Sequence, residues 1–148
     1  MNELLISQTK AIMDKNLPLI TNLSNLSSLI KDGIKGTSWA GFYLSNNEGT
    51  SLYLGPFQGK VACTLIPFGK GVCGTSALTK KTILVPDVNK FEGHIACSST
   101  SRSEVVVPII KDSKCVGVID LDSDDYDNFN EDDSMTLETI AELIKDLF

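Results

Sequence analysis

Two strongly apolar runs constrain the fold more than any other feature of the chain. Residues 104–110 and 114–121 are rich in valine and isoleucine, and a short polar segment around 111–114 joins them. Two β-branched runs separated by a turn are typical of a β-hairpin. Because these are the most apolar strands of the chain, we expect them near the centre of an antiparallel sheet.

The remaining pattern places helices at both ends of the chain and short strands between them. Apolar residues recur at helical spacing, and Asn130 is a suitable N-cap for the last helix. The predicted elements are helices at 4–12, 19–30 and 131–147, strands at 38–44, 51–54, 60–66 and 82–85, a short helix at 75–79 and a long loop at 86–103. This order predicts an α+β domain with a central antiparallel sheet, terminal helices on one face and long loops on the other.

Length and charge narrow the class of protein. The 148 residues fall in the range of one domain, so we expect a single domain over residues 1–148. The net charge of −6 makes nucleic acid a poor partner, because phosphate binding requires clustered lysine and arginine. No apolar run is long enough for a membrane span, and the first residues lack a basic leader. We therefore expect a cytoplasmic protein with no membrane partner.

Three of the four cysteines, Cys63, Cys73 and Cys97, lie in one glycine-rich stretch. Their spacing does not fit zinc, whose cysteine ligands lie only a few residues apart. Cys73 stands between glycines near the predicted start of a short helix, where partial positive charge would lower the pKa of its thiol. We expect thiols on such turns to move toward one another, as a dithiol redox cycle requires. Cys115, in an apolar strand, is expected to be a buried structural residue.

Acidic and aromatic side chains mark one face of the predicted sheet. Asp120 and Asp122 are two residues apart, so both point to the same face, and Glu104 can meet them across the hairpin. In the first predicted strand, the same alternation places Trp39 and Tyr43 on one face. Two interpretations stay open for each set. The carboxylates either line a site or point into solvent at strand ends, and the aromatic pair either lines a pocket or packs in the core.

Several of these residues belong to motifs of a known family. The motifs are Trp39-Ala-Gly-Phe-Tyr43, Gly71-Val-Cys-Gly-Thr75, Gly93-His-Ile-Ala-Cys97, Ser103-Glu-Val-Val-Val-Pro108 and Gly117-Val-Ile-Asp-Leu-Asp-Ser123. Through them the chain resembles the free methionine-(R)-sulfoxide reductase family, which consists of single GAF-type domains. The resemblance implies a GAF fold whose ligand pocket lies between the sheet and the loops that cover it.

The resemblance also implies an activity, the reduction of free L-methionine (R)-S-oxide to methionine in oxidative-stress repair. It implies that Glu104, Asp120 and Asp122 bind the substrate's ammonium group and serve the sulfoxide oxygen, while Trp39 and Tyr43 surround its methyl group. Three clustered carboxylates repel one another, so at least one should keep its proton near neutral pH and act as a proton donor. Which of the three donates stays open.

The mechanism that we expect uses thiols, without a metal or a bound cofactor. The Cys97 thiolate attacks the sulfoxide sulfur, methionine leaves, and Cys97 becomes a sulfenic acid that a second thiol converts to a disulfide. We favour Cys63 as this resolving residue and keep Cys73 as an alternate, because the sequence does not rank them. Thioredoxin or a similar dithiol would reduce the disulfide. His94, in the same loop as Cys97, is given no proton-transfer role.

The competing class is a regulatory GAF module that senses a small molecule without catalysis, because fold does not fix function. A sensor normally needs an output domain, for which we see no room in 148 residues. A cysteine hydrolase is disfavoured, since no convincing third group accompanies Cys97 and His94. Should the chain form a homodimer, we expect its terminal helices to make the contact.

Overall fold

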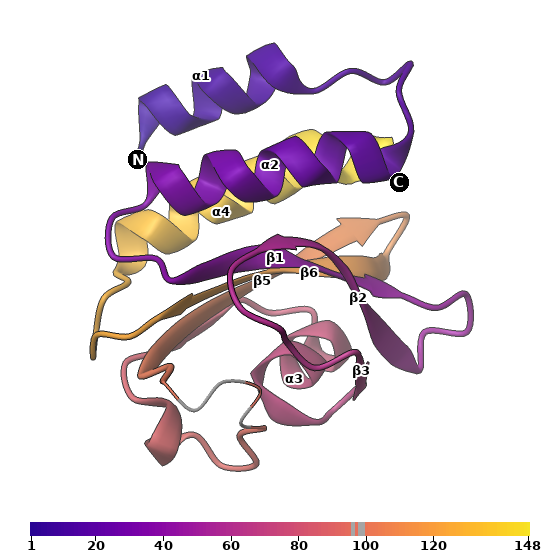
Figure 1. Ribbon diagram of the computed structural model, residues 1–148. Coiled ribbons are helices and arrows are strands. Elements are labelled where there is room, and N and C mark those ends of the chain that lie inside the picture. Colours follow the sequence, from indigo (N-terminus) through magenta and orange to yellow (C-terminus); the bar gives the residue numbers. More distant parts are fainter. Residues whose placement is uncertain (96, 98–99) are drawn as a thin grey trace.

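A six-stranded sheet organises the molecule (Figure 1). The computed structural model describes residues 1–95, 97 and 100–148. All neighbouring strands are antiparallel, in the order β3-β2-β1-β6-β5-β4. The strands are β1 (Trp39–Ser45), β2 (Ser51–Gln58), β3 (Leu65–Pro67), β4 (Ile83–Val85), β5 (Ser103–Lys111) and β6 (Lys114–Ser123). The predicted hairpin is present as β5 and β6, and β6 lies in the middle of the sheet beside β1.

The helices divide between the two faces of the sheet (Figure 1). Helices α2 (Leu19–Gly33) and α4 (Glu131–Ile144) pack on one face, and α1 (Glu3–Ile12) lies over them. Helix α3 (Gly71–Thr79) and the long loops lie on the other face. Two short 3-10 helices complete the chain, η1 (Val88–Lys90) and η2 (Lys145–Leu147). The predicted α+β architecture is confirmed. Within the described residues, every helix is too short or too polar to cross a bilayer.

The start of α4 follows the sequence prediction. The Asn130 side chain accepts a hydrogen bond from the Asp133 backbone N–H at 2.9 Å, and the Asp133 carboxylate accepts one from the Asn130 backbone N–H at 3.0 Å. This reciprocal pair satisfies two backbone donors that a helix start would otherwise leave unpaired. The stripe that contains Leu137 and Ile140 is buried against the sheet. The cap and the stripe together fix α4 over the central strands.

Strand alternation separates two apolar cores, one on each face of the sheet. Phe42, Ile119 and Leu121 pack with the helices on one side. Trp39 and Tyr43 pack in the second core on the α3 side. Neighbouring residues in a strand point to opposite faces, so residues that alternate with the first core must face α3. The predicted partition of β1 into two faces is therefore confirmed.

The segment between β2 and α3 differs from the sequence prediction. Strand β3 begins at Leu65 rather than residue 60, and α3 begins at Gly71 rather than residue 75. At Gly59 the chain adopts φ of +136°, and a Cβ there would lie 2.5 Å from Cδ1 of Trp39. The backbone therefore turns away from the sheet over the Trp39 indole. This contact links residues distant in sequence, so local pattern alone did not predict it.

Candidate active site

The strand register gathers three carboxyl groups on the α3 side of the sheet. Asp122 pairs with Glu104 on β5 and with Trp39 on β1, which aligns these side chains in one row across three strands. Asp120 lies in an adjacent row, opposite Gly41. Directly opposed residues share a face and lie about 5 Å apart at Cβ. The structure thus brings Glu104 to both aspartates across the hairpin, as the sequence predicts.

Burial dominates the electrostatics of this acidic cluster, which we define as Glu104, Asp120 and Asp122. Glu104 and Asp120 are only 7% and 5% exposed. Burial raises the pKa of all three groups, and the charge of Asp120 further raises the pKa values of Glu104 and Asp122. The two aspartates next to Glu104 add to this rise in its pKa, which favours the protonated acid at Glu104.

The acidic cluster is suited to a cationic ligand. Among the described residues, the salt bridges involve none of its members. Oδ1 of Asp120 is buried and accepts no hydrogen bond from the described part of the protein. Buried carboxylates are stable when they are paired with a cation or hydrogen-bonded, so an ammonium group here would be bound favourably.

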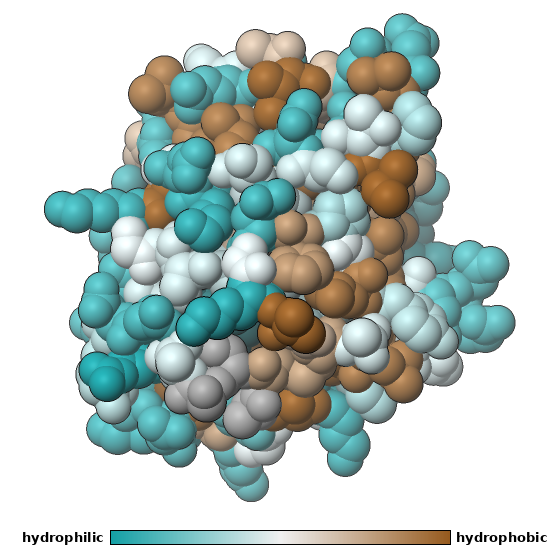
Figure 2. All heavy atoms as spheres, viewed as in Figure 1, coloured by the Kyte–Doolittle hydropathy of each residue, from teal (hydrophilic) through white to brown (hydrophobic). Residues whose placement is uncertain are grey.

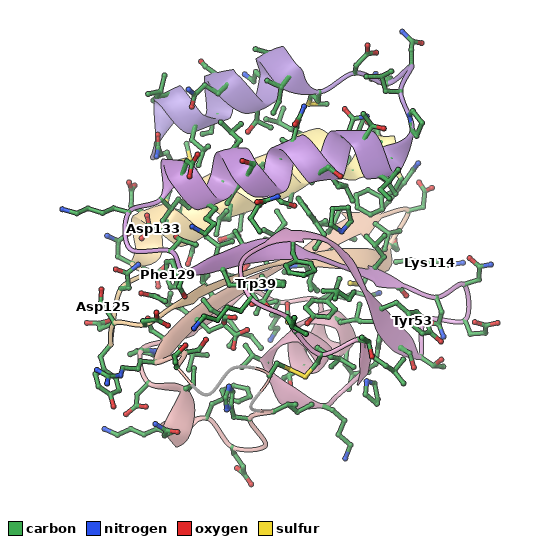
Figure 3. The ribbon with its side chains drawn as sticks, in the orientation of Figure 1. Trp39, Tyr53, Lys114, Asp125, Phe129 and Asp133 are labelled. Atoms are coloured by element: carbon green, nitrogen blue, oxygen red, sulfur yellow. A yellow bond between two sulfur atoms is a disulfide. The ribbon has the colours of Figure 1, made fainter. Side chains whose placement is uncertain are left out.

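A disulfide joins Cys63 to Cys97 next to this cluster (Figure 3, where the S–S bond is yellow). Cys63 precedes β3, Cys97 lies in the loop before β5, and their Cα atoms are 5.3 Å apart. Both residues are half-buried, and Cys97 lines the same cavity as Glu104. The two thiols that the sequence analysis favoured as nucleophile and resolving residue are thus within bonding distance of each other.

The environment of Cys73 contradicts the sequence prediction. The residue lies within the first turn of α3 rather than on a mobile turn, and it is 4% exposed. Burial raises the pKa of its thiol well above the ordinary value, and the negative charges of Asp120 and Glu104 add to this effect. The predicted lowering of the thiol pKa by the helix N-terminus is wrong, because desolvation and nearby carboxylates outweigh it. Cys73 is a free cysteine beside the cavity.

Trp39 and Tyr43 form one wall of the cavity and also contact the chain that carries Cys63. Their rings stack at 6.0 Å between centroids, and Trp39 stacks on Phe57 at 5.2 Å. The Trp39 Nε1–H donates to the Lys60 carbonyl at 3.0 Å, and the Tyr43 hydroxyl donates to the Cys63 carbonyl at 2.9 Å. The sequence analysis missed these polar contacts and the stacking of Phe57. No local pattern signals them.

Gly41, which lies between these aromatics on β1, leaves room for their packing. The register between β1 and β2 shifts between Gly41 and Tyr43, where β2 has one residue more than β1. A Cβ at this position would lie 2.4 Å from Cβ of Phe57 and 2.9 Å from the Trp39 ring. Phe57 and Trp39 therefore occupy the space that the missing side chain provides.

These groups surround a cavity of about 180 Å³. Its lining residues include Trp39, Tyr43, Cys73, His94, Cys97, Glu104, Asp120 and Asp122. The volume is below the roughly 300–1,000 Å³ of pockets for drug-sized ligands, so a ligand the size of one amino acid fits better than a nucleotide.

Two further groups bear on the chemistry of the cavity. Among the described residues, one group of three could hold a metal ion. It consists of Cys73, Glu104 and Asp120, whose ligand atoms all lie within 4.8 Å of one another. His94 is half-buried at the cavity, and burial lowers its pKa, so the neutral imidazole is favoured at neutral pH. Cys115 is buried as predicted, and its thiol donates to the Gly117 carbonyl at 3.2 Å.

Fold and site define a GAF-type domain with a pair of cysteines that form a disulfide at an acidic cavity, and comparison with known proteins agrees. The GAF domain family matches residues 31–145. The free methionine-R-sulfoxide reductase of Saccharomyces cerevisiae is 51% identical over 96% of this chain and 82% of its own length. The enzyme of the same name from Escherichia coli is 40% identical over 91% of this chain and 81% of its own length.

A solved structure leads to the same family. The free methionine-R-sulfoxide reductase of Neisseria meningitidis, in complex with its substrate, superposes with a TM-score of 0.93. It is 39% identical, and the match covers 99% of this chain and 87% of that one. The chain belongs to the GAF-domain family of free methionine-R-sulfoxide reductases, which are oxidoreductases.

Proposed function

We propose that this protein reduces free L-methionine (R)-S-oxide to methionine. The observation that carries the proposal is the Cys63–Cys97 disulfide at the edge of a cavity that holds three buried carboxyl groups. The names of the relatives give the oxidised substrate and its R configuration. A disulfide is the product that two thiols leave after they have reduced a sulfoxide.

Substrate binding follows from the charges of the cavity. Asp120 and Asp122 would hold the substrate ammonium group, and the aromatic wall of Trp39 and Tyr43 would contact its methyl and sulfur. A peptide-bound methionine sulfoxide has an amide in place of this ammonium group, so it would lose the ion pair. This difference accounts for a preference for the free amino acid.

The first chemical step transfers the sulfoxide oxygen to a protein sulfur. The Cys97 thiolate attacks the sulfoxide sulfur, and Glu104 donates a proton to the oxygen as the S–O bond weakens. Methionine leaves and Cys97 becomes a sulfenic acid. Glu104 is our choice of donor because burial and the two neighbouring aspartates raise its pKa well above the usual value, which favours its protonated form.

The second step forms the disulfide and releases water. The Cys63 thiol attacks the Cys97 sulfenic acid, its proton leaves with the hydroxyl group, and an S–S bond replaces the S–O bond. A dithiol such as thioredoxin then reduces the disulfide and becomes a disulfide itself. Val61 and Ile95, which flank the two cysteines in sequence, are 90% and 36% exposed. Figure 2 shows apolar side chains on this face over the region of β2, β3 and α3, which suits contact with a protein reductant.

The remaining parts of the proposal concern the setting of the enzyme. Residues 1–148 would act as one catalytic domain. A cytoplasmic location suits the free thiols Cys73 and Cys115 and a disulfide that must be reduced in each cycle. A homodimer through the terminal helices stays a prediction. The alternative of a ligand-sensing GAF module gives no reason for a disulfide at the cavity.

Incubation of the purified protein with each free methionine sulfoxide diastereomer and dithiothreitol tests the proposed function. We expect methionine from the R isomer and at most a trace from the S isomer, measured by chromatography of the amino acids. Methionine sulfoxide within a short peptide serves as the control for the ammonium contact and should be a poor substrate. Release of methionine from neither isomer would refute the enzymatic function and favour the sensor.

A further inference from the structure

The segment that carries Cys63 depends on side chains for its position. Residues 59–64 form neither helix nor strand, and β3 begins only at Leu65. Lys60 and Val61 are both exposed, with Val61 90% exposed. A chain segment with few buried contacts and no ladder of backbone hydrogen bonds opens easily. Something must therefore hold Cys63 where Cys97 can reach it.

Two hydrogen-bond donors on β1, in the middle of the sheet, hold this segment in place. The Tyr43 hydroxyl donates to the Cys63 carbonyl at 2.9 Å, and the Trp39 Nε1–H donates to the Lys60 carbonyl at 3.0 Å. These two bonds connect the segment to β1. The backbone N–H of Leu54 donates to the Thr64 carbonyl at 3.0 Å, which connects the end of the segment to β2.

The position of the Tyr43 hydroxyl is itself fixed by packing. Tyr43 is 2% exposed, its ring stacks against Trp39, and Trp39 stacks in turn against Phe57. Strand β1 pairs with β2 on one side and β6 on the other. A side chain that is packed on all sides keeps one rotamer, so the Tyr43 hydroxyl stays in a fixed position next to the Cys63 carbonyl.

We propose that Tyr43 is a positioning residue for the resolving cysteine: its hydroxyl holds the backbone of Cys63 so that the Cys63 thiol reaches Cys97. The inference rests on the proposed function, and it adds a second role to a side chain that lines the substrate cavity. Burial and the negative charge of Asp120 raise the pKa of Tyr43, so the hydroxyl keeps the proton that it donates.

The proposal concerns the bond-forming step rather than the substrate. When Cys63 attacks the Cys97 sulfenic acid, an S–S bond forms, the S–O bond breaks, and water carries away the hydroxyl with the thiol proton. The rate of such an intramolecular step depends on how often the two sulfurs meet in a reactive geometry. Loss of the Tyr43 hydrogen bond lets residues 60–63 move away and lowers that frequency.

The variant Tyr43→Phe tests this role, because it keeps the ring and removes only the hydroxyl. We expect the equilibrium constant for forming the Cys63–Cys97 disulfide against a glutathione redox buffer to fall about tenfold, equivalent to about 1.4 kcal/mol. The measurement counts protein thiols by mass spectrometry after alkylation and requires no methionine sulfoxide. It therefore stands even if the proposed enzymatic function fails.

A second readout uses the enzymatic reaction. After reduced Tyr43→Phe reacts with the R isomer, we expect dimedone to trap Cys97 as a sulfenic acid in a larger fraction of molecules than in the unmodified protein. Cys63→Ser sets the upper limit for this trapping. Tyr53→Phe is the matched control, because Tyr53 lies on β2 with 51% of its surface exposed. It should match the unmodified protein in both assays.

Two results would overturn the proposal. One is a disulfide equilibrium constant in Tyr43→Phe that equals that of the unmodified protein. The other is an equal fall of this constant in Tyr43→Phe and Tyr53→Phe, which would show a general effect of tyrosine loss. Thermal unfolding of the reduced variants shows whether the fold itself is destabilised. Trp39→Phe removes the donor to the Lys60 carbonyl, and we expect a smaller fall in the disulfide equilibrium constant for this variant.

Discussion

Substitution of Cys97 by serine is expected to lower the release of methionine by roughly 10³-fold or more with any reductant. The proposed first step requires a thiolate at Cys97, and a serine hydroxyl is a far weaker nucleophile toward sulfur at neutral pH. The Cys97 sulfur lies half-buried at the cavity that Glu104 also lines, and in the structure it is bonded to Cys63. Initial rates of methionine release with dithiothreitol provide the measurement.

Two matched variants separate this result from a loss of structure. Cys115→Ser changes a cysteine of β6, whose thiol donates to the Gly117 carbonyl, and it should keep full activity. Cys73→Ser tests the alternate thiol. If Cys97→Ser retained turnover while Cys73→Ser abolished it, Cys73 would be the nucleophile and the proposed order of the cysteines would be wrong.

Substitution of Glu104 by glutamine is expected to lower kcat/KM by about 100-fold or more, because glutamine cannot transfer a proton to the sulfoxide oxygen. In the unmodified protein the rate should decline as pH rises through the raised pKa of the acidic cluster. If Glu104 is the proton donor, the rate of the Glu104→Gln variant should not fall as pH rises through this range. Rate measurements across pH with the R isomer would show both effects.

The same substitution should stabilise the fold at neutral and alkaline pH. The pKa of Glu104 is higher in the folded than in the unfolded state, so above the unfolded pKa the folded state binds more protons. The stability that the protonated Glu104 contributes is therefore lost as pH rises. Glutamine does not titrate, so the variant does not lose stability in this way. At pH 8 we expect Glu104→Gln to raise the free energy of unfolding by about 1 kcal/mol or more, with a smaller gain near pH 5.

Denaturant unfolding of the reduced proteins at both pH values checks this expectation. Glu138→Gln is the control, because Glu138 is exposed on α4 and should change stability little. A Glu104→Gln variant that is less stable than the unmodified protein at pH 8 would contradict this expectation, because it would show that the buried Glu104 carboxyl stabilises the fold at that pH.

Period-two alternation carried most of what the sequence predicted. It predicted Asp120 and Asp122 on one face together with Glu104 of the neighbouring strand, and it separated Trp39 and Tyr43 from the helix-side core. Helical periodicity and an N-cap located the terminal helices. These features depend on neighbours that are close in sequence or joined by a tight turn, so local rules describe them well.

The errors arose where distant segments meet. From the sequence we interpreted the glycines around Cys73 as a sign of mobility. In the structure, Gly69 and Gly71 adopt positive φ where the chain turns into α3, and this helix buries the Cys73 thiol. The hydrogen bond from Tyr43 to the Cys63 carbonyl depends on a loop that packs onto β1. No spacing within one element reports a contact of this kind.

Counting products in the absence of a reductant tests the central claim most directly. Fully reduced protein, with its four cysteine thiols, is mixed with excess free methionine (R)-sulfoxide, and methionine and thiols are measured together. We predict one methionine per chain and the loss of two thiols, with mass spectrometry locating the new disulfide at Cys63 and Cys97 and leaving Cys73 and Cys115 free. Methionine release without this disulfide, or a disulfide without methionine, would contradict the account.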